Sequence, residues 1–186
     1  MAAHKNYIGG KWVESVTGKT YPVHNPAHTD QVVGEFQTSG VEDTLTAVAA
    51  AKEGLVTWTN TPAPARAIII YKALEILGRR AEELAETITI EEGKPIADAR
   101  GEVKRAMAIM EYAAGEGRRM FGYTTPSEFP DTVAYTVRRP LGVVGIITPW
   151  NFPLAIPAWK IAPALICGNA LVFKPASATP LSAVKL

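Results

Sequence analysis

Residues 143–153 read Val-Val-Gly-Ile-Ile-Thr-Pro-Trp-Asn-Phe-Pro, and this stretch decides the fold. Its first five residues form an apolar run typical of a buried strand, and the amphipathic segment that follows, ending near Cys167, predicts a helix. Asn151 therefore lies between a strand and a helix, and Pro149 and Pro153 restrict the backbone on both sides of it. Ligands of open α/β sheets bind at such strand ends. The structural alternative is an Asn that caps the helix.

A second strand end follows one helix later. Ala170 to Phe173 is predicted to be a short buried strand, Lys174 and Ser177 come at its end, and Pro180 opens the next helix. The two strands and the helix between them form a βαβ unit, which brings Asn151 and Lys174 to one edge of the sheet. A Lys and a Ser at such an edge can hold ribose hydroxyls or a phosphate. A solvated Lys beside a proline turn is the alternative.

The sequence upstream of this unit predicts mainly helices. The expected elements are a small hairpin in 7–13, a strand in 31–37, helices in 41–58, 64–77, 81–92 and 96–113, and a half-exposed alternating strand in 132–139. Gly93 and Pro95 form the expected stop signal of the third helix. The fourth helix carries one apolar stripe, formed by Ile96, Ala99, Val103, Ala106, Met110 and Ala113.

Composition excludes several classes of protein. The chain has 186 residues and a net charge of +1, so there is no electrostatic case for binding nucleic acid or an anionic membrane. No apolar run reaches the ~18 residues that span a bilayer, and the first residues lack the apolar core of a signal peptide. We therefore expect a cytoplasmic protein. The single cysteine, Cys167, rules out an intrachain disulfide and a Cys-rich zinc site, and no metal is expected.

Together these segments resemble the aldehyde dehydrogenase superfamily. The likeness is carried by Gly142–Pro153 (GVVGIITPWNFP), Trp159–Leu165 and Gly168–Pro180, with weaker echoes at Tyr7–Trp12, Asn25–Ala27, Arg66 and Glu91–Pro95. It spans nearly the whole chain in the order of the family, whose chains are more than twice as long. We therefore expect an N-terminal piece of such an enzyme, with the catalytic Cys and the general-base Glu lying outside this sequence.

The resemblance implies an α/β fold in three parts. Residues 1–130 would form an N-terminal arm and helices of the cofactor-binding domain. Residues 131–140 would add one strand to the sheet that bridges subunits, in a homodimer or homotetramer. Residues 141–186 would form the first βαβ unit of a Rossmann-like cofactor-binding domain.

The resemblance also implies the chemistry of the complete protein. A Cys thiolate attacks the aldehyde, the thiohemiacetal is oxidised to a thioester by NAD(P), and water releases the acid. Asn151 would hold the oxyanion, and Lys160 matches a Lys assigned to a charge relay, with a helix-surface Lys as the alternative. The substrate tunnel, or equally a buried helix face, would comprise Phe152, Ala155, Ile156 and Trp159. The cofactor would meet Thr148, Pro149, Trp150 and Asn151, and its adenosine ribose Lys174, Pro175, Ala176 and Ser177.

Three positions refine the expectation. NAD-preferring members often have a Glu where Ser177 stands, so the loss of that negative charge favours NADP or dual use of NADP and NAD. Trp159 stands where members that oxidise carboxylate-bearing semialdehydes often have an Arg, which favours medium-length aliphatic or aromatic aldehydes over succinate semialdehyde. The run Ile156–Lys160 also resembles members linked to α-ketoglutarate semialdehyde, which points the other way. Cys167 has no His nearby and is expected to be structural and half-buried.

The leading interpretation is NAD(P)-dependent oxidation of an aldehyde by the complete protein, with this chain inactive alone. The alternative is a non-catalytic nucleotide-binding or assembly module built on the same half-domain. The third interpretation is another class of dehydrogenase, in which the Pro-Trp-Asn-Phe-Pro segment would have no role.

Overall fold

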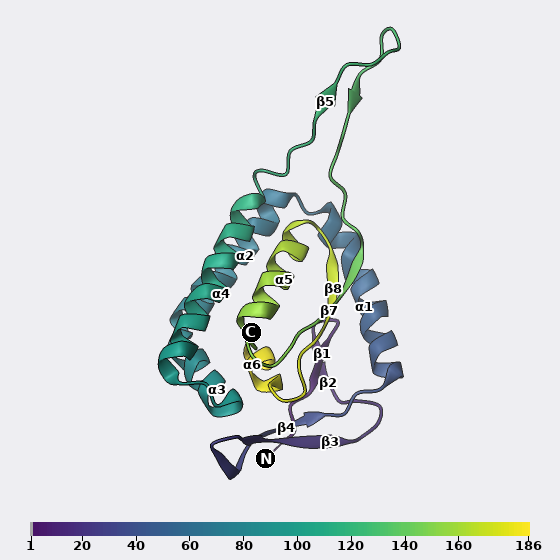
Figure 1. Cartoon of the computed structure of the whole chain (residues 1–186). Coiled ribbons are helices and arrows are strands. Elements are labelled where there is room, and N and C mark those ends of the chain that lie inside the picture. The colour runs from purple at the N-terminus through teal and green to yellow at the C-terminus, as the bar shows by residue number, and fades with distance from the viewer. Residues whose placement is uncertain (1) are drawn as a thin grey trace.

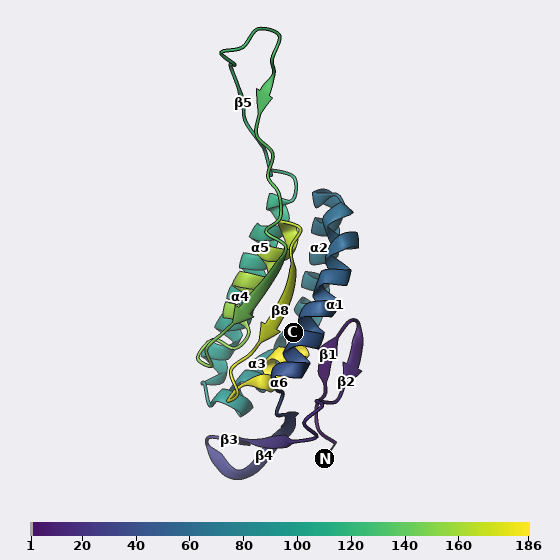
Figure 2. The ribbon, with the colours of Figure 1, turned by 90° about the vertical axis from the view of Figure 1, so that its right-hand side faces the viewer.

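A computed structural model describes residues 2–186, and a pair of parallel strands lies at its centre. β7 (Val143–Ile147) and β8 (Ala170–Lys174) pair from Val143 opposite Ala170 to Ile147 opposite Lys174. α5 (Ala155–Ile166) connects them, which makes the predicted βαβ unit. α1 (Val41–Asn60) covers the other face of the pair, so the strands are sandwiched between two helices (Figures 1 and 2).

The remaining long helices pack outside α5. α2 (Ala63–Arg79), α3 (Ala81–Glu92) and α4 (Ile96–Glu116) follow one another, and α4 lies along α5 (Figure 1). The predicted stripe of α4 is confirmed, because all its members except the partly buried Ile96 belong to the buried core. The helix α6 (Pro180–Lys185) begins at the proline, as predicted.

Small backbone features explain where these helices begin and end. Gly93 caps α3 in the left-handed region, with φ of 86°, where a side chain on Cβ is disfavoured. Pro62 and Pro95 precede α2 and α4, and Pro64 occupies the first turn of α2. Gly78 is accommodated within α2, which continues to Arg79.

Two buried polar side chains hold the start of the βαβ unit together. The Asn169 Oδ1 atom accepts hydrogen bonds from the backbone amides of Leu141, at 2.7 Å, and Gly142, at 3.0 Å. Arg66 donates from Nε to the carbonyl of Ile166 at 3.0 Å. Each side chain thus pairs with backbone groups of a segment distant in sequence. They fix the amino-terminal ends of the strands, opposite to the edge where ligands are expected.

The N-terminal segment forms two antiparallel hairpins. β1 (Asn6–Ile8) pairs with β2 (Lys11–Val13) around Gly9 and Gly10, which confirms the hairpin predicted in 7–13. In the second, β3 (Thr20–Asn25) pairs with β4 (His28–Gln37), so the strand predicted in 31–37 was too short and its partner was missed. A proline inside β3 hides the strand from pattern analysis, since proline is disfavoured in paired strands.

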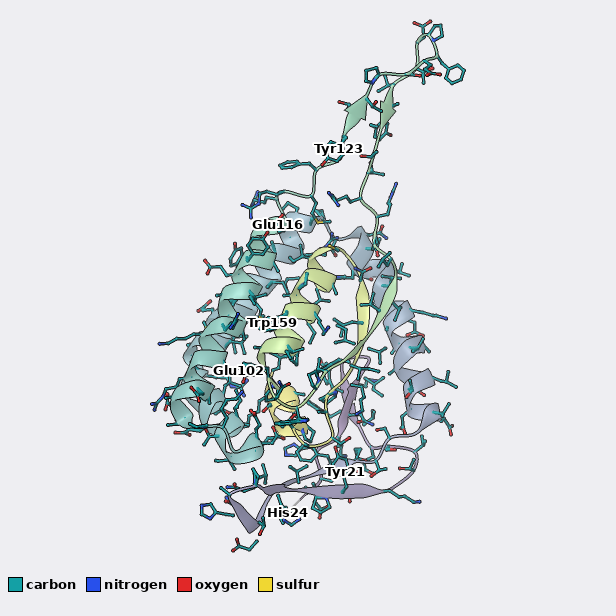
Figure 3. The ribbon with its side chains drawn as sticks, in the orientation of Figure 1. Tyr21, His24, Glu102, Glu116, Tyr123 and Trp159 are labelled. Atoms are coloured by element: carbon teal, nitrogen blue, oxygen red, sulfur yellow. The ribbon has the colours of Figure 1, made fainter. Side chains whose placement is uncertain are left out.

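The segment 118–141 projects from the helical body as a long hairpin (Figures 1 and 2). The strand predicted in 132–139 is wrong in its extent. Only β6 (Ala134–Tyr135) is regular, and it pairs with β5 (Thr124–Thr125). The exposed large apolar side chains of the segment 118–141 are Phe121, Tyr123, Phe129, Val133, Tyr135, Val137 and Leu141. Figure 3 shows Tyr123 on this hairpin and Tyr21 and His24 on β3, at the opposite end of the molecule.

Among residues 2–186, no helix combines the length and the apolar character that a membrane crossing requires.

Candidate functional site at the carboxyl edge of the parallel strands

The structure brings the two predicted strand ends together. Ile147 pairs with Lys174, and the Thr148 amide donates to the carbonyl of Lys174 at 3.4 Å. The loop that carries Asn151 therefore starts beside the residue that ends β8. This confirms that Asn151 and Lys174 follow neighbouring strand ends at the same edge of the sheet.

The loop between β7 and α5 presents its side chains unevenly. Thr148 is buried, whereas Pro149, Trp150 and Asn151 are exposed. Within residues 2–186 the side-chain amide of Asn151 forms no hydrogen bond. Its NH2 group is therefore free to donate to a bound oxygen atom.

The capping alternative for Asn151 is wrong, because a different residue caps α5. The helix starts after Leu154, and no side chain of the loop caps it. Instead, one carboxylate oxygen of Glu102, on α4, accepts hydrogen bonds from the amides of Leu154, at 2.9 Å, and Ala155, at 3.0 Å. The negative charge also faces the positive end of the α5 dipole.

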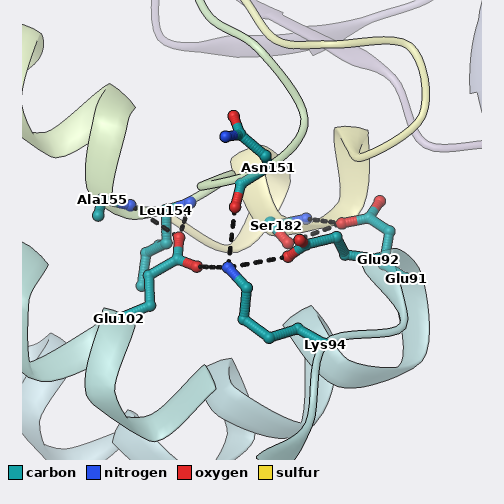
Figure 4. Close-up of polar contacts among 8 residues, drawn as sticks. All are labelled: Glu91, Glu92, Lys94, Glu102, Asn151, Leu154, Ala155 and Ser182. Carbon is teal, nitrogen blue, oxygen red and sulfur yellow. Dashed lines mark hydrogen bonds and ion pairs between the residues drawn. The ribbon is translucent and has the colours of Figure 1, made fainter. Parts of the chain in front are cut away.

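Lys94 links this cap to the Asn151 loop (Figure 4). Its Nζ atom lies 2.6 Å from the second carboxylate oxygen of Glu102 and donates to the backbone carbonyl of Asn151 at 2.9 Å. The same ammonium lies 3.2 Å from an oxygen of Glu92 and 4.2 Å from the ring centroid of Phe152. Burial raises the pKa of Glu92, and the Lys94 ammonium opposes that effect.

Sequence reasoning found only part of this network. Lys94 appeared only within the resemblance at Glu91–Pro95, and Glu102 was not identified. A signal for Glu102 does exist, since it lies three residues after Ala99 and four before Ala106, on the apolar stripe of α4. A charged residue on a buried helix face needs a partner, and here the partners are Lys94 and the start of α5.

A second buried carboxylate fixes the segment that follows β8. Glu91 accepts hydrogen bonds from the Ser182 amide at 2.8 Å, from the Ser182 hydroxyl at 2.6 Å and from the Leu181 amide. Burial raises the pKa of Glu91, and these hydrogen bonds act in the opposite direction. The start of α6 is thereby anchored to α3, which limits where Ser177 can lie.

The predicted ribose-binding segment lies beside a cavity of about 300 Å³. Lys174 and Ser177 are exposed, and Pro175 and Ala176 are partly buried. The cavity is lined by Pro22, Val23, His24, Pro26, Glu91, Glu92, Trp150, Ser177, Ala178 and Thr179. Ser177 and Trp150 thus line the same cavity, although they follow different strands.

The predicted substrate residues divide into two groups. Ala155 is fully buried in the core, whereas Phe152, Ile156 and Trp159 are partly buried. The rings of Phe152 and Trp159 are 6.4 Å apart, and the guanidinium carbon of Arg105, on α4, lies 5.6 Å from the Trp159 ring.

Lys160 and Cys167 lie apart from this arrangement. Lys160 is exposed and forms no ion pair within residues 2–186, so its relay role stays a prediction. The expectation that Cys167 is half-buried is wrong, because the thiol is exposed in the turn after α5. Cys167 is the C-cap residue of α5, and Gly168 follows it with φ of 87°. The described residues contain no group of three or more His, Cys, Asp or Glu side chains that could hold a metal ion.

Comparison with known proteins identifies the family to which the chain is similar. The model of the aldehyde dehydrogenase family matches residues 12–186. The chain is 45% identical over 181 residues to an α-ketoglutaric semialdehyde dehydrogenase of Bacillus subtilis, covering 97% of this chain and 37% of that protein. It is 46% identical over 182 residues to malonate-semialdehyde dehydrogenase 1 of Geobacillus thermodenitrificans, and the match covers 98% of this chain and 37% of that protein.

Solved structures show the same fold. An NADP-dependent enzyme of E. coli superposes with a TM-score of 0.95 at 36% identity, over 98% of this chain and 38% of that one. A succinate-semialdehyde dehydrogenase of Burkholderia pseudomallei superposes with a TM-score of 0.94 at 37% identity, over 97% of this chain and 37% of that one. The chain belongs to the aldehyde dehydrogenase family. It spans 37% of the length of the Bacillus subtilis relative and corresponds to the N-terminal portion of the family's chain.

Proposed function

We propose that the complete protein oxidises an aldehyde to a carboxylic acid with NADP or NAD, and that its substrate is a semialdehyde with a distal carboxylate. The observation that carries the proposal is the free amide of Asn151 at the carboxyl edge of two parallel strands, in a chain that belongs to the aldehyde dehydrogenase family. In this proposal Asn151 donates to the oxyanion that forms when a thiolate, supplied from outside these residues, attacks the aldehyde.

The residues beyond β8 fit a dinucleotide. Lys174 and Ser177 are exposed, and neither forms a hydrogen bond or ion pair through its side chain with a carboxylate of residues 2–186. Glu91 and Glu92 line the nearby cavity, but the start of α6 and Lys94 engage their carboxylates. When bound, the dinucleotide supplies the oxidising power.

Ser177 favours NADP or dual use in this proposal. Its hydroxyl carries no negative charge that would repel a 2′-phosphate, and Lys174 adds a cation three residues away. Solved relatives include the NADP-dependent E. coli enzyme and a protein in complex with nicotinamide adenine dinucleotide, so both cofactors occur among similar structures.

Arg105 supports a carboxylate-bearing substrate. Phe152 directly follows Asn151, and its ring packs near the ring of Trp159. Arg105 lies over the Trp159 ring. The Arg105 guanidinium has no carboxylate partner among residues 2–186, and in this proposal the Phe152 and Trp159 rings form the apolar wall between it and the Asn151 amide. That order suits an aldehyde at one end and a carboxylate at the other, which Arg can hold through two hydrogen bonds.

This arrangement reverses the preference that Trp159 alone predicts. The indole replaces the Arg expected in semialdehyde-oxidising members, but α4 brings a different Arg to the same indole. The relatives named for α-ketoglutaric and malonate semialdehydes support the same choice. We therefore favour a semialdehyde over an uncharged aldehyde.

The experiment compares Arg105→Met with the unchanged complete protein on two substrates, α-ketoglutarate semialdehyde and an uncharged aldehyde of the same chain length. Losing hydrogen bonds to a charged group costs about 1.5–3 kcal/mol, so kcat/KM for the semialdehyde should fall about tenfold to hundredfold. The uncharged aldehyde should be affected less than about threefold, because the Met stem still packs on the indole. Equal losses on both substrates would refute the carboxylate-binding role.

A further inference from the structure

The backbone around Asn151 has few contacts of its own. Residues 149–151 form no backbone–backbone hydrogen bond within the described chain, and Thr148 is the last residue of the loop tied to β8. Among residues 2–186, one hydrogen bond holds the Asn151 backbone, namely that from Lys94 Nζ to its carbonyl at 2.9 Å. The placement of the Asn151 side chain therefore depends on a lysine 57 residues earlier in the chain.

We propose that Lys94 is a positioning residue for Asn151, and that Glu102 anchors both Lys94 and the start of α5. This inference rests on the proposed function, because it assigns to Lys94 the task of presenting the Asn151 amide to the reacting oxygen. Lys94 touches no reacting atom in this proposal and acts only through the loop.

The charged groups of this network are largely buried. The side chains of Lys94, Glu102 and Glu92 are 13%, 0% and 7% exposed, so the ammonium cannot be satisfied by water alone. Buried charges require partners, and removing one partner leaves the others uncompensated. Glu102 is held from its other oxygen by two amides of α5, which fixes the point from which Lys94 reaches Asn151.

The same lysine also lies against the apolar side of the site. Its Nζ atom is 4.2 Å from the centroid of the Phe152 ring, an attractive cation–π contact. Lys94 thus holds the carbonyl of one site residue and the ring of the next. A shift of about 1 Å in such a constellation can lower a rate about a hundredfold.

The test uses Lys94→Met in the complete protein, with Arg66→Met as the matched control. Arg66 is also a buried cation that donates to backbone carbonyls, but it does so at the opposite end of α5. Both variants should be less stable. Only Lys94→Met should lower kcat about tenfold or more with KM changed less than about twofold, as expected when an oxyanion donor is misplaced.

A double-mutant cycle separates positioning from general damage. If Lys94 acts through Asn151, adding Lys94→Met to Asn151→Ala should lower kcat less than about twofold further, because the donor has already been removed. Independent losses that multiply would overturn the inference, and so would an unchanged kcat in Lys94→Met.

Amide hydrogen exchange gives a readout that does not depend on activity. Lys94→Met should speed exchange in the peptide covering 148–156, whereas Arg66→Met should speed exchange around 165–170. Unchanged exchange in 148–156 would overturn the inference whatever the kinetics. If Asn151→Ala itself leaves kcat unchanged, the proposed role of Asn151 fails, while faster exchange in Lys94→Met still supports the hold of Lys94 on the loop.

Discussion

At the residue scale, the side-chain amide of Asn151 is the group that the proposed chemistry depends on most. Asn151→Ala in the complete protein should lower kcat/KM about a hundredfold or more, since one oxyanion donor is worth about 3 kcal/mol in the transition state. Steady-state kinetics with saturating cofactor measures the loss.

The thermal midpoint of the same variant serves as its control. Glu102 already caps α5, so the Asn151→Ala protein should melt close to the unchanged protein. Near-normal kcat/KM together with a midpoint several degrees lower would show that Asn151 is a structural residue.

Ser177 is the residue with which cofactor preference can be tested. Ser177→Glu in the complete protein should weaken the use of NADP far more than the use of NAD, because the new carboxylate would face the 2′-phosphate. The ratio of kcat/KM for the two cofactors is the measurement, and Ser177→Gln, which has the same size without the charge, is the control. Equal loss with both cofactors would show that Ser177 does not approach the ribose.

At the scale of elements, local patterns predicted what local forces determine. The apolar run of β7, the stripe of α4 and the stop signal at Gly93 all depend on neighbours in sequence, and each was found. β3 was missed because a proline masks it. Within the hairpin 118–141, a strand was predicted in 132–139, but only Ala134 and Tyr135 find a pairing partner among the described residues.

The candidate site shows the same contrast between features set by neighbours in sequence and features set by tertiary contacts. Asn151 could be located because the prolines and the strand end around it are adjacent in sequence. The roles of Glu102 and Arg105 could not, because the residues in and just before α5 that they contact are 52 and more residues away and only helix packing brings them together. Tertiary contacts of this kind leave at most an indirect trace, such as the charge of Glu102 on the apolar stripe of α4.

The contact between α3 and α6 has a testable pH dependence. Hydrogen bonds from Arg80 and Lys185 lower the pKa of Glu83 from 4.5 to about 2. A carboxylate whose pKa is lowered on folding stabilises the folded state above its unfolded value, and this contribution is lost as the pH falls from 4.5 towards about 2.

Glu83→Gln in the complete protein should therefore have a lower urea midpoint than the unchanged protein at neutral pH. The difference should narrow as the pH falls below 4.5, and it should be small because the ion pairs are exposed. Glu86→Gln, on the same helix, is the control. A difference that stays constant down to the acid limit would show that the ion pairs do not stabilise the fold.

The projecting hairpin 118–141 is the element that we expect to join subunits. Its apolar side chains are largely exposed, and unpaired edges of this kind readily pair with another chain. Val133→Asp combined with Tyr135→Asp should shift the complete protein towards monomers in light scattering coupled to gel filtration. Tyr112→Asp, at an equally exposed tyrosine on α4, should leave the mass unchanged, and an unchanged mass in the hairpin variant would contradict the role.

At the scale of the whole molecule, the site is built from the contacts among elements far apart in sequence. β7 and β8 supply the edge, Glu102 on α4 caps α5, Lys94 in the turn before α4 holds the loop that follows β7, and α3 anchors the segment beyond β8. Because other elements supply these stabilising contacts, the loop can expose an unpaired amide while the elements around it remain packed. The stabilising contacts lie beneath the loop, and the reactive surface faces away from them.

The 186-residue chain expressed by itself should reduce neither NAD nor NADP in the presence of an aldehyde. Its thiol, Cys167, follows α5, whereas Asn151 precedes it. The 12 residues of α5 separate the two ends by about 18 Å, too far for one aldehyde to meet both groups. The histidines that could activate a thiol, His4, His24 and His28, lie in the N-terminal hairpin region. Aldehyde-dependent cofactor reduction that survives purification and disappears in Cys167→Ala would overturn this assignment, whereas activity that persists in Cys167→Ala would point to a contaminating enzyme.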